Sequence, residues 1–178
     1  MVCGAEVTER DYLNGLRTVA RNQAVSVKIV ERPKSPSQVV DYARTLQDRD
    51  PGAFDQTWCV LDVDDFDDIP QAVAAAGRGH RIRIALSNPC FELWLLLHHV
   101  DHRAFAPDCD HLKPLLDKHL PGGYSKTGLN FRHFAGGWQD AVGRAKALAP
   151  FGEELRHNPS TGVWRLAQEI SGQPSDGR

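Results

Sequence analysis

The sequence lacks the features that mark several large classes of protein. Its longest apolar run, at 93–97, is far shorter than the ~20 residues that span a membrane. No basic segment followed by an apolar one opens the chain, so no secretion signal is visible. The four cysteines form no Cys-x-x-Cys pair. We therefore expect a cytoplasmic protein that has no disulfide framework and does not contact a membrane.

Two further absences narrow the function. The net charge is −2, so no global basic field advertises nucleic-acid binding, although a local basic groove is compatible with this total. There is no Walker-type glycine-rich loop, so we do not expect the chain to bind ATP by itself. The sequence leaves the oligomeric state open, including assembly of identical copies.

The chain is long enough for one core. Its 178 residues, 41% of them hydrophobic, predict a single domain over 1–171 and a flexible tail over 172–178. Strand-like and helix-like segments alternate up to about residue 100, which predicts an α/β fold with a mainly parallel central sheet flanked by helices. A helical C-terminal extension over about 101–171 follows. The expected helices are 8–22, 36–46, 70–76, 90–98, 112–119, 138–148 and 163–170, the last capped by Ser160 or Thr161; the expected strands are 24–30, the segment from 57, and 81–86.

The segment 57–65 reads as a buried strand that ends in three carboxylates, Asp62, Asp64 and Asp65. Side chains alternate along a strand, so Asp62 and Asp64 point to the same side. Ligands bind at the carboxyl ends of strands in open α/β sheets, and paired carboxylates suit Mg²⁺ or Mn²⁺. The structural alternative is that Asp64 and Asp65 only cap the next helix.

Glu6 and Glu9 belong at the same edge of the sheet. Glu6 lies just past the expected first strand and just before the first helix, and Glu9 lies one helical turn further on. A carboxylate there can bind the metal or act as general base toward a water that attacks a phosphate. Alternatively, both acids only favour the helix N-terminus through its dipole, worth ~0.3–1 kcal/mol.

The run that follows the strand 81–86 carries polar side chains into the next helix. We expect Asn88 at the carboxyl edge and Glu92 in the first helical turn, facing the cleft, while Phe91, Trp94 and Leu97 are core. The alternatives are that Asn88 is only a helix cap and that Glu92 only satisfies the helix dipole.

A glycine-rich loop over 122–128 contains Lys126 and is suited to meeting a phosphate. Arg132 and His133 lie close by in the sequence, and Phe131 and Trp138 could offer a stacking surface for bases. The commoner role of such a segment is a solvated loop.

A zinc site is the other metal hypothesis. His98 and His102 would share a helix face, and Cys109 could supply a thiolate; the full candidate set is His98, His99, His102, Cys109 and His111. The spacing matches no standard zinc finger. Histidines at a helix end also interact favourably with the terminal carbonyls, which is the structural alternative.

These residues together resemble the RloB-like family, prokaryotic proteins found near restriction and abortive-infection loci, with a Toprim-like fold. The matching blocks are Cys3 to Glu9, Asp62-Val63-Asp64-Asp65, Ser87-Asn88-Pro89-Cys90-Phe91-Glu92-Leu93-Trp94 and Asn158-Pro159-Ser160-Thr161. The resemblance implies that Glu6, Asp62 and Asp64 hold Mg²⁺ for phosphodiester chemistry. It also implies a later catalytic lysine, for which we take Lys126.

The resemblance predicts a nuclease that acts on RNA or DNA in anti-phage defence, under control of a partner ATPase. The alternative is a non-catalytic binding or sensor module that docks on that ATPase. The chain departs from the family pattern in reading Cys3-Gly4-Ala5-Glu6 where Cys-Glu-Gly-Glu is usual. Only Met1 and Val2 precede Cys3, so we expect a truncated first strand.

Overall fold

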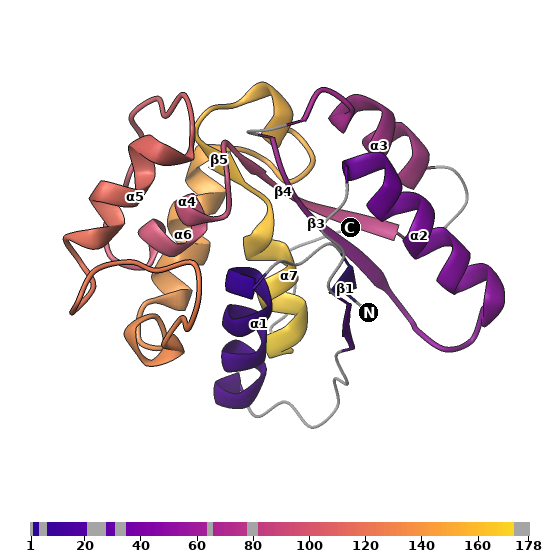
Figure 1. Cartoon of the computed structure of the whole chain (residues 1–178), viewed down its shortest axis with the longest axis horizontal. Coiled ribbons are helices and arrows are strands. Elements are labelled where there is room, and N and C mark those ends of the chain that lie inside the picture. The colour runs from indigo at the N-terminus through magenta and orange to yellow at the C-terminus, as the bar shows by residue number, and fades with distance from the viewer. Residues whose placement is uncertain are drawn as a thin grey trace.

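A computed structural model describes residues 2–3, 7–20, 28–30, 35–63, 66–77 and 82–172. Within these residues the chain forms a five-stranded sheet in the order β2-β1-β3-β4-β5 (Figure 1). The pairs β2–β1, β1–β3 and β3–β4 run parallel, whereas β4–β5 runs antiparallel. The strands are β1 (Val2–Cys3), β2 (Ile29–Val30), β3 (Thr57–Asp62), β4 (Ile82–Asn88) and β5 (Ser160–Thr161).

The described residues also form seven α-helices, each at a place where the sequence predicts one. Strands and helices in this arrangement confirm the mixed α/β class. The helices are α1 (Val7–Ala20), α2 (Pro36–Arg49), α3 (Ile69–Ala76), α4 (Glu92–Leu97), α5 (Cys109–Asp117), α6 (Trp138–Leu148) and α7 (Val163–Ser171), with 3₁₀ turns η1 (Phe131–His133) and η2 (Glu154–Arg156). Residues 24–27 of the predicted second strand and 173–178 of the predicted tail lie outside the described residues.

The sheet separates two hydrophobic cores. Helices α2 and α3 cover one face, while α1 and α7 lie on the other with α4, α5 and α6 beyond them (Figure 1). Because strand side chains alternate, Cys59 and Leu61 of β3 join the core under α2 and α3. Trp58 and Val60 join the larger core with the remaining helices. The C-terminal third therefore shares its core with α1 and the sheet.

Ser160 and Thr161 form β5 rather than the predicted cap of α7, and Gly162 precedes the helix. Pairing with the end of β4 satisfies both residues: the Ser87 and Thr161 hydroxyls lie 3.0 Å apart, and the Ser160 hydroxyl donates to the Glu154 carbonyl at 3.0 Å. Thr161 Oγ1 still accepts from the Val163 amide at 3.3 Å. The prediction of a helix cap was wrong because contacts with a distant strand outweigh the local preference.

Cys90 and Cys109 form a disulfide, with Cα atoms 5.8 Å apart. The expectation that the cysteines form no disulfide was therefore wrong. The 19-residue separation conceals that α5 packs back onto α4 and returns Cys109 to the start of that helix. In the described part of the chain, no helix has the length and apolar character required to cross a membrane.

Candidate functional site

Asp62 ends β3 at the carboxyl edge of the sheet. It is half-buried and lies opposite Ser87 in the register of β3 with β4. The next residue anchors this end, because the Val63 amide donates to the carbonyls of Ser87 and Pro89, both at 3.0 Å. Two strand ends therefore hold Asp62 where ligands bind in open α/β sheets. Of the other predicted metal ligands, Glu6 and Asp64 lie outside the described residues, as does Asp65.

A second acidic cluster joins the first turn of α1 to α4. The Tyr124 hydroxyl donates to Glu92 Oε1 at 2.8 Å and lies 3.4 Å from Thr8 Oγ1. Glu9 and Glu92 are 8% and 4% exposed, so both carboxyl groups are buried. Burial raises the pKa of Tyr124, and the neighbouring Glu92 and Glu9 charges raise it further. Tyr124 therefore stays protonated and serves as a hydrogen-bond donor between two acids.

Lys126 lies in an exposed loop that is tied to the same turn of α1. The Thr8 hydroxyl donates to the Lys126 carbonyl at 2.9 Å, so the backbone of the lysine is held beside the residues that follow Glu6. Thr8, in the first turn of α1, therefore ties the loop to that helix. The sequence analysis did not single out Tyr124, although Tyr124 and Lys126 lie in the same short loop.

Phe131 and Trp138 do not form the stacking surface that the sequence suggested. They are only 9% and 7% exposed and belong to the larger core. The Phe131 ring packs edge-on against Tyr12, with centroids 5.2 Å apart. Aromatic rings near a basic loop are more stable here in the core than on the surface, because burial removes a large apolar area from water.

Asn88 joins two distant Asn-Pro segments rather than capping a helix or facing an open cleft. Its amide donates to the Glu154 carbonyl at 3.1 Å, and its Oδ1 accepts from Asn158 Nδ2 at 3.1 Å. Asn158 in turn accepts from the Ala106 amide at 2.9 Å and donates to the Ala106 carbonyl at 2.8 Å. The Asn88-Pro89 and Asn158-Pro159 peptide bonds are both cis. Asn88 is therefore a bridge between β4, η2 and the loop before α5.

Glu92 is buried, contrary to the expectation that it faces the cleft. Its Oε2 lies 2.9 Å from Cys109 Sγ, on the side where α5 covers α4. The predicted burial of Phe91, Trp94 and Leu97 is confirmed, at 1%, 0% and 0% exposed. The amphipathic pattern fails at Glu92 because every residue of α4 is buried, so this helix has no solvent face.

The histidine-based zinc site is wrong. His98 Nδ1 donates to the Trp94 carbonyl at 2.8 Å, which leaves Nε2 to accept from the Tyr12 hydroxyl at 2.9 Å. Burial lowers the pKa of His98 to about 3, so the ring is neutral and both nitrogens are engaged. The other candidates diverge: His111 Nδ1 lies 2.7 Å from Asp108, and Cys109 is bonded to Cys90.

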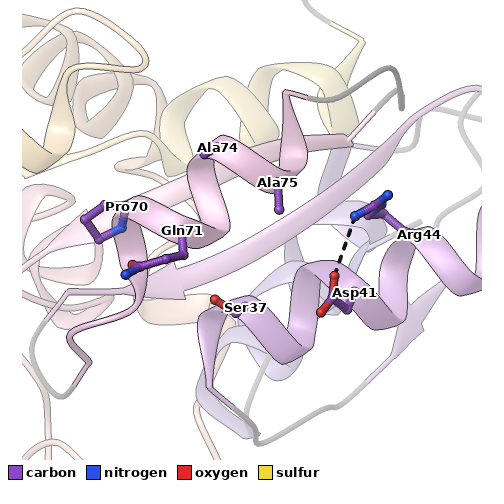
Figure 2. A pocket seen from close by; sticks show the side chains of 7 residues that line it. All are labelled: Ser37, Asp41, Arg44, Pro70, Gln71, Ala74 and Ala75. Carbon is purple, nitrogen blue, oxygen red and sulfur yellow. Dashed lines mark ion pairs between the residues drawn. The ribbon is translucent and has the colours of Figure 1, made fainter.

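A groove of about 520 Å³ runs between α2 and α3, on the far side of the sheet from the acidic cluster (Figure 2). Its only acid is paired with its only base, since Asp41 lies 3.7 Å from Arg44 on the same helix. The lining residues are Ser37, Asp41, Arg44, Pro70, Gln71, Ala74 and Ala75. This groove therefore brings together no set of groups suited to catalysis.

Comparison with known proteins bears on the carboxyl edge of the sheet, where Asp62 lies. A family model described as RloB-like protein matches residues 1–170, which is nearly the whole chain. No match is found among curated proteins or among solved structures. The match spans the strand end at Asp62, the turn from β4 into α4 and the Asn158 segment that packs against it. The chain belongs to the RloB-like protein family.

Proposed function

We propose that this protein has a Toprim-like fold and is a metal-dependent nuclease that cuts RNA or DNA as the effector of a prokaryotic anti-phage defence system. Its membership of the RloB-like family and the position of Asp62 at the carboxyl edge of the sheet support the proposal. A partner ATPase would control the activity, as the family resemblance suggests.

The register of β1 with β3 carries the proposal. Cys3 lies opposite Cys59 in this parallel pair. Glu6 follows Cys3 by three positions and Asp62 follows Cys59 by three positions. Parallel strands advance side by side toward one edge, and equal offsets are the pattern expected of two acids that share that edge. This supports a shared role for Glu6 and Asp62.

The donor chemistry fits a hard divalent cation. Glu6, Asp62 and Asp64 offer only carboxylate oxygens, which Mg²⁺ and Mn²⁺ prefer. When bound, the metal would polarise the phosphate and favour ionisation of an attacking water. Glu6 would help orient that water, and Lys126 would meet the negative charge of the phosphate from its exposed loop.

Glu9, Asp65, Asn88 and Glu92 would support the site from around it. Glu9 and Glu92 flank Tyr124, whose contact with Thr8 keeps the Lys126 loop against α1. Asn88 holds the end of β4, which is the strand beside Asp62. These residues would act by positioning the strand ends and the loop.

The test is cleavage of labelled RNA and DNA with Mg²⁺ or Mn²⁺, with and without the ATPase proposed as the partner. Asp62→Asn should lower cleavage at least about 100-fold, because metal coordination supplies several kcal/mol in the transition state and each 1.36 kcal/mol is about tenfold. Asp55→Asn is the matched control, because it makes the same change at an exposed position before the start of β3. Equal cleavage by parent and Asp62→Asn would refute the proposal.

The second candidate is a non-catalytic binding or sensor module that docks on the partner ATPase. One observation favours it: Asn88 and Glu92, two polar residues of the family motif, are held in internal contacts instead of facing open solvent. This alternative predicts that Asp62→Asn binds the ATPase as well as the parent does, and that neither protein cleaves nucleic acid. Co-purification with the ATPase, run beside the cleavage assay, separates the two.

A further inference from the structure

A second cluster of metal-ligating side chains lies where β4 turns into α4. Ligand atoms of Cys90, Glu92 and Cys109 all lie within 4.8 Å of one another. All three residues are buried, at 3%, 4% and 7% exposed. Across the described part of the chain, this is the one group of three or more Cys, His, Asp or Glu residues that is compact enough to hold an ion.

The Glu92 side chain is buried, and no ion-pair partner contacts it among the described residues. Its contacts are the Tyr124 hydroxyl, 2.8 Å from Oε1, and Cys109 Sγ, 2.9 Å from Oε2. Burying a carboxylate is costly unless it is paired with positive charge or fully hydrogen-bonded. One neutral hydroxyl and one sulfur provide no positive charge and few hydrogen bonds. The site therefore favours a cation next to Oε2.

We propose that the reduced protein binds a soft divalent cation, with Zn²⁺ as the prototype, through Cys90 Sγ, Cys109 Sγ and Glu92 Oε2. Thiolates together with a carboxylate are ligands that zinc accepts in tetrahedral sites. Zinc–sulfur and zinc–oxygen bonds of about 2.3 and 2.1 Å place neighbouring ligand atoms roughly 3.5–3.8 Å apart. Atoms already confined within 4.8 Å reach this arrangement by side-chain rotation. A water completes the four-coordinate shell.

Tyr124 supplies the outer support that such a site needs. By donating to Oε1, its hydroxyl orients the carboxylate and leaves Oε2 directed at Cys109. Ligating carboxylates are commonly held by hydrogen bonds of this kind, and losing one costs about 10–100-fold in metal affinity. Tyr124 is thus a positioning residue of the proposed site.

The disulfide in the structure is the metal-free state of the same site. A dithiol reductant would supply two electrons and two protons, breaking the S–S bond to give two thiols while the reductant becomes a disulfide. Zinc binding then releases both thiol protons to solvent and leaves two thiolates on the metal. The site would link the start of α4 to the start of α5 in both states.

The experiment uses the full chain, stripped of metal and kept reduced with a phosphine. Zinc is titrated against a chromophoric chelator, and cobalt is titrated in parallel to look for thiolate-to-metal charge-transfer absorption. The parent should bind one equivalent of zinc and show that absorption. Cys90→Ala and Glu92→Gln should weaken zinc binding at least about 100-fold, beyond the roughly 10–100-fold expected for Tyr124→Phe.

Two kinds of variant protect the conclusion against misfolding and against binding elsewhere. Cys109→Ser keeps a hydrogen-bond donor for Glu92 but removes the sulfur, so its loss of zinc reports ligation. Cys59→Ala removes a buried cysteine from the opposite core, and Asp62→Asn removes the acid proposed to hold magnesium. Both should bind zinc as the parent does.

Alkylation followed by mass measurement gives an independent readout. Zinc should protect two thiols in the reduced parent, and peptide mapping should assign them to Cys90 and Cys109. The proposal is overturned if the reduced parent binds no zinc, or if zinc binding survives in both cysteine variants. It is also overturned if Asp62→Asn abolishes binding, which would assign the zinc to the carboxyl edge of the sheet.

Discussion

Two helical glycines should respond in opposite ways to the same substitution. A Cβ added to Gly15, in α1, would collide with Cβ and Cγ of Phe131 and lie 2.7 Å from its Cδ2. A Cβ added to Gly143, in α6, meets nothing within 4 Å. Both glycines are in helix interiors, so both replacements gain the same backbone advantage. The difference between the two variants therefore measures the contact between α1 and η1.

The magnitudes follow from this contact. Alanine is better than glycine by about 0.5–1 kcal/mol in a helix interior, and overpacking a filled core costs about 1–3 kcal/mol. Phe131 has little room to withdraw, because its ring packs on Tyr12 with centroids 5.2 Å apart. Gly15→Ala should therefore lower the free energy of unfolding by about 0.5–2 kcal/mol. Gly143→Ala should raise it by about 0.5–1 kcal/mol.

Thermal melts under identical conditions provide the assay. At this size 1 kcal/mol corresponds to roughly 2–4 °C, so the Tm should fall by about 1–8 °C for Gly15→Ala and rise by about 1–4 °C for Gly143→Ala. In a Phe131→Leu background the collision is relieved, and the Gly15→Ala effect should shift in the stabilising direction by about 1 kcal/mol or more. A rise in Tm for Gly15→Ala in the parent background would refute the close packing of α1 on η1.

Two further predictions concern polar side chains that are held in internal hydrogen bonds. Asn158→Asp replaces the amide group that donates to the Ala106 carbonyl and to Asn88 with a carboxylate that only accepts. We expect this change to lower the free energy of unfolding, measured in urea, by about 2–5 kcal/mol. Asn130→Asp is the control: it keeps an acceptor for the Arg132 amide and should cost less than about 0.5 kcal/mol. Burial lowers the pKa of His98 to about 3, so the unfolded chain binds this proton more readily. The contribution of neutral His98 to the free energy of unfolding is therefore fully present above about pH 6.5. It falls by up to about 1.4 kcal/mol per pH unit as the pH drops toward 3. His98→Gln should remove this dependence of the free energy of unfolding on pH, and His157→Gln, at an exposed position, should leave it unchanged. An unchanged pH dependence in His98→Gln would show that the proton binds elsewhere.

Local signals in the sequence were sufficient for most elements. The apolar spacing gave α6 its observed bounds, Trp138–Leu148, because one face of that helix packs on the core and the other meets solvent. Helix α5 begins three residues before the predicted start at residue 112, where a capping signal is present: the Asp108 side chain accepts from the His111 amide at 3.0 Å. A capping residue such as Asp108 can therefore mark a helix start before any apolar periodicity begins.

Contacts between distant segments were beyond local patterns. Nothing in the spacing of Cys90 and Cys109 shows that α5 packs back onto α4, and nothing in the Lys126 loop shows that Tyr124 reaches Glu92. β5 has two residues and depends on hydrogen bonds to β4, so it has no periodicity of its own. Each of these features is fixed by packing in three dimensions rather than by neighbours in the chain.

The strongest family motif in this chain is a poor guide to the residues of the proposed nuclease site. Asn88 and Glu92 lie in the block that identifies the family most specifically, yet both are buried and bonded to other parts of the fold. Substituting either would disturb packing as well as any reaction, so a loss of cleavage there would not reveal a catalytic role. Asp62 lies in a much less specific motif, but it is half-buried at a strand end, where a charge-removing substitution leaves the core intact. The decisive variant for catalysis is therefore at Asp62, and the decisive variants for the sulfur site are at Cys90 and Cys109, because each removes a ligand of only one of the two proposed metals.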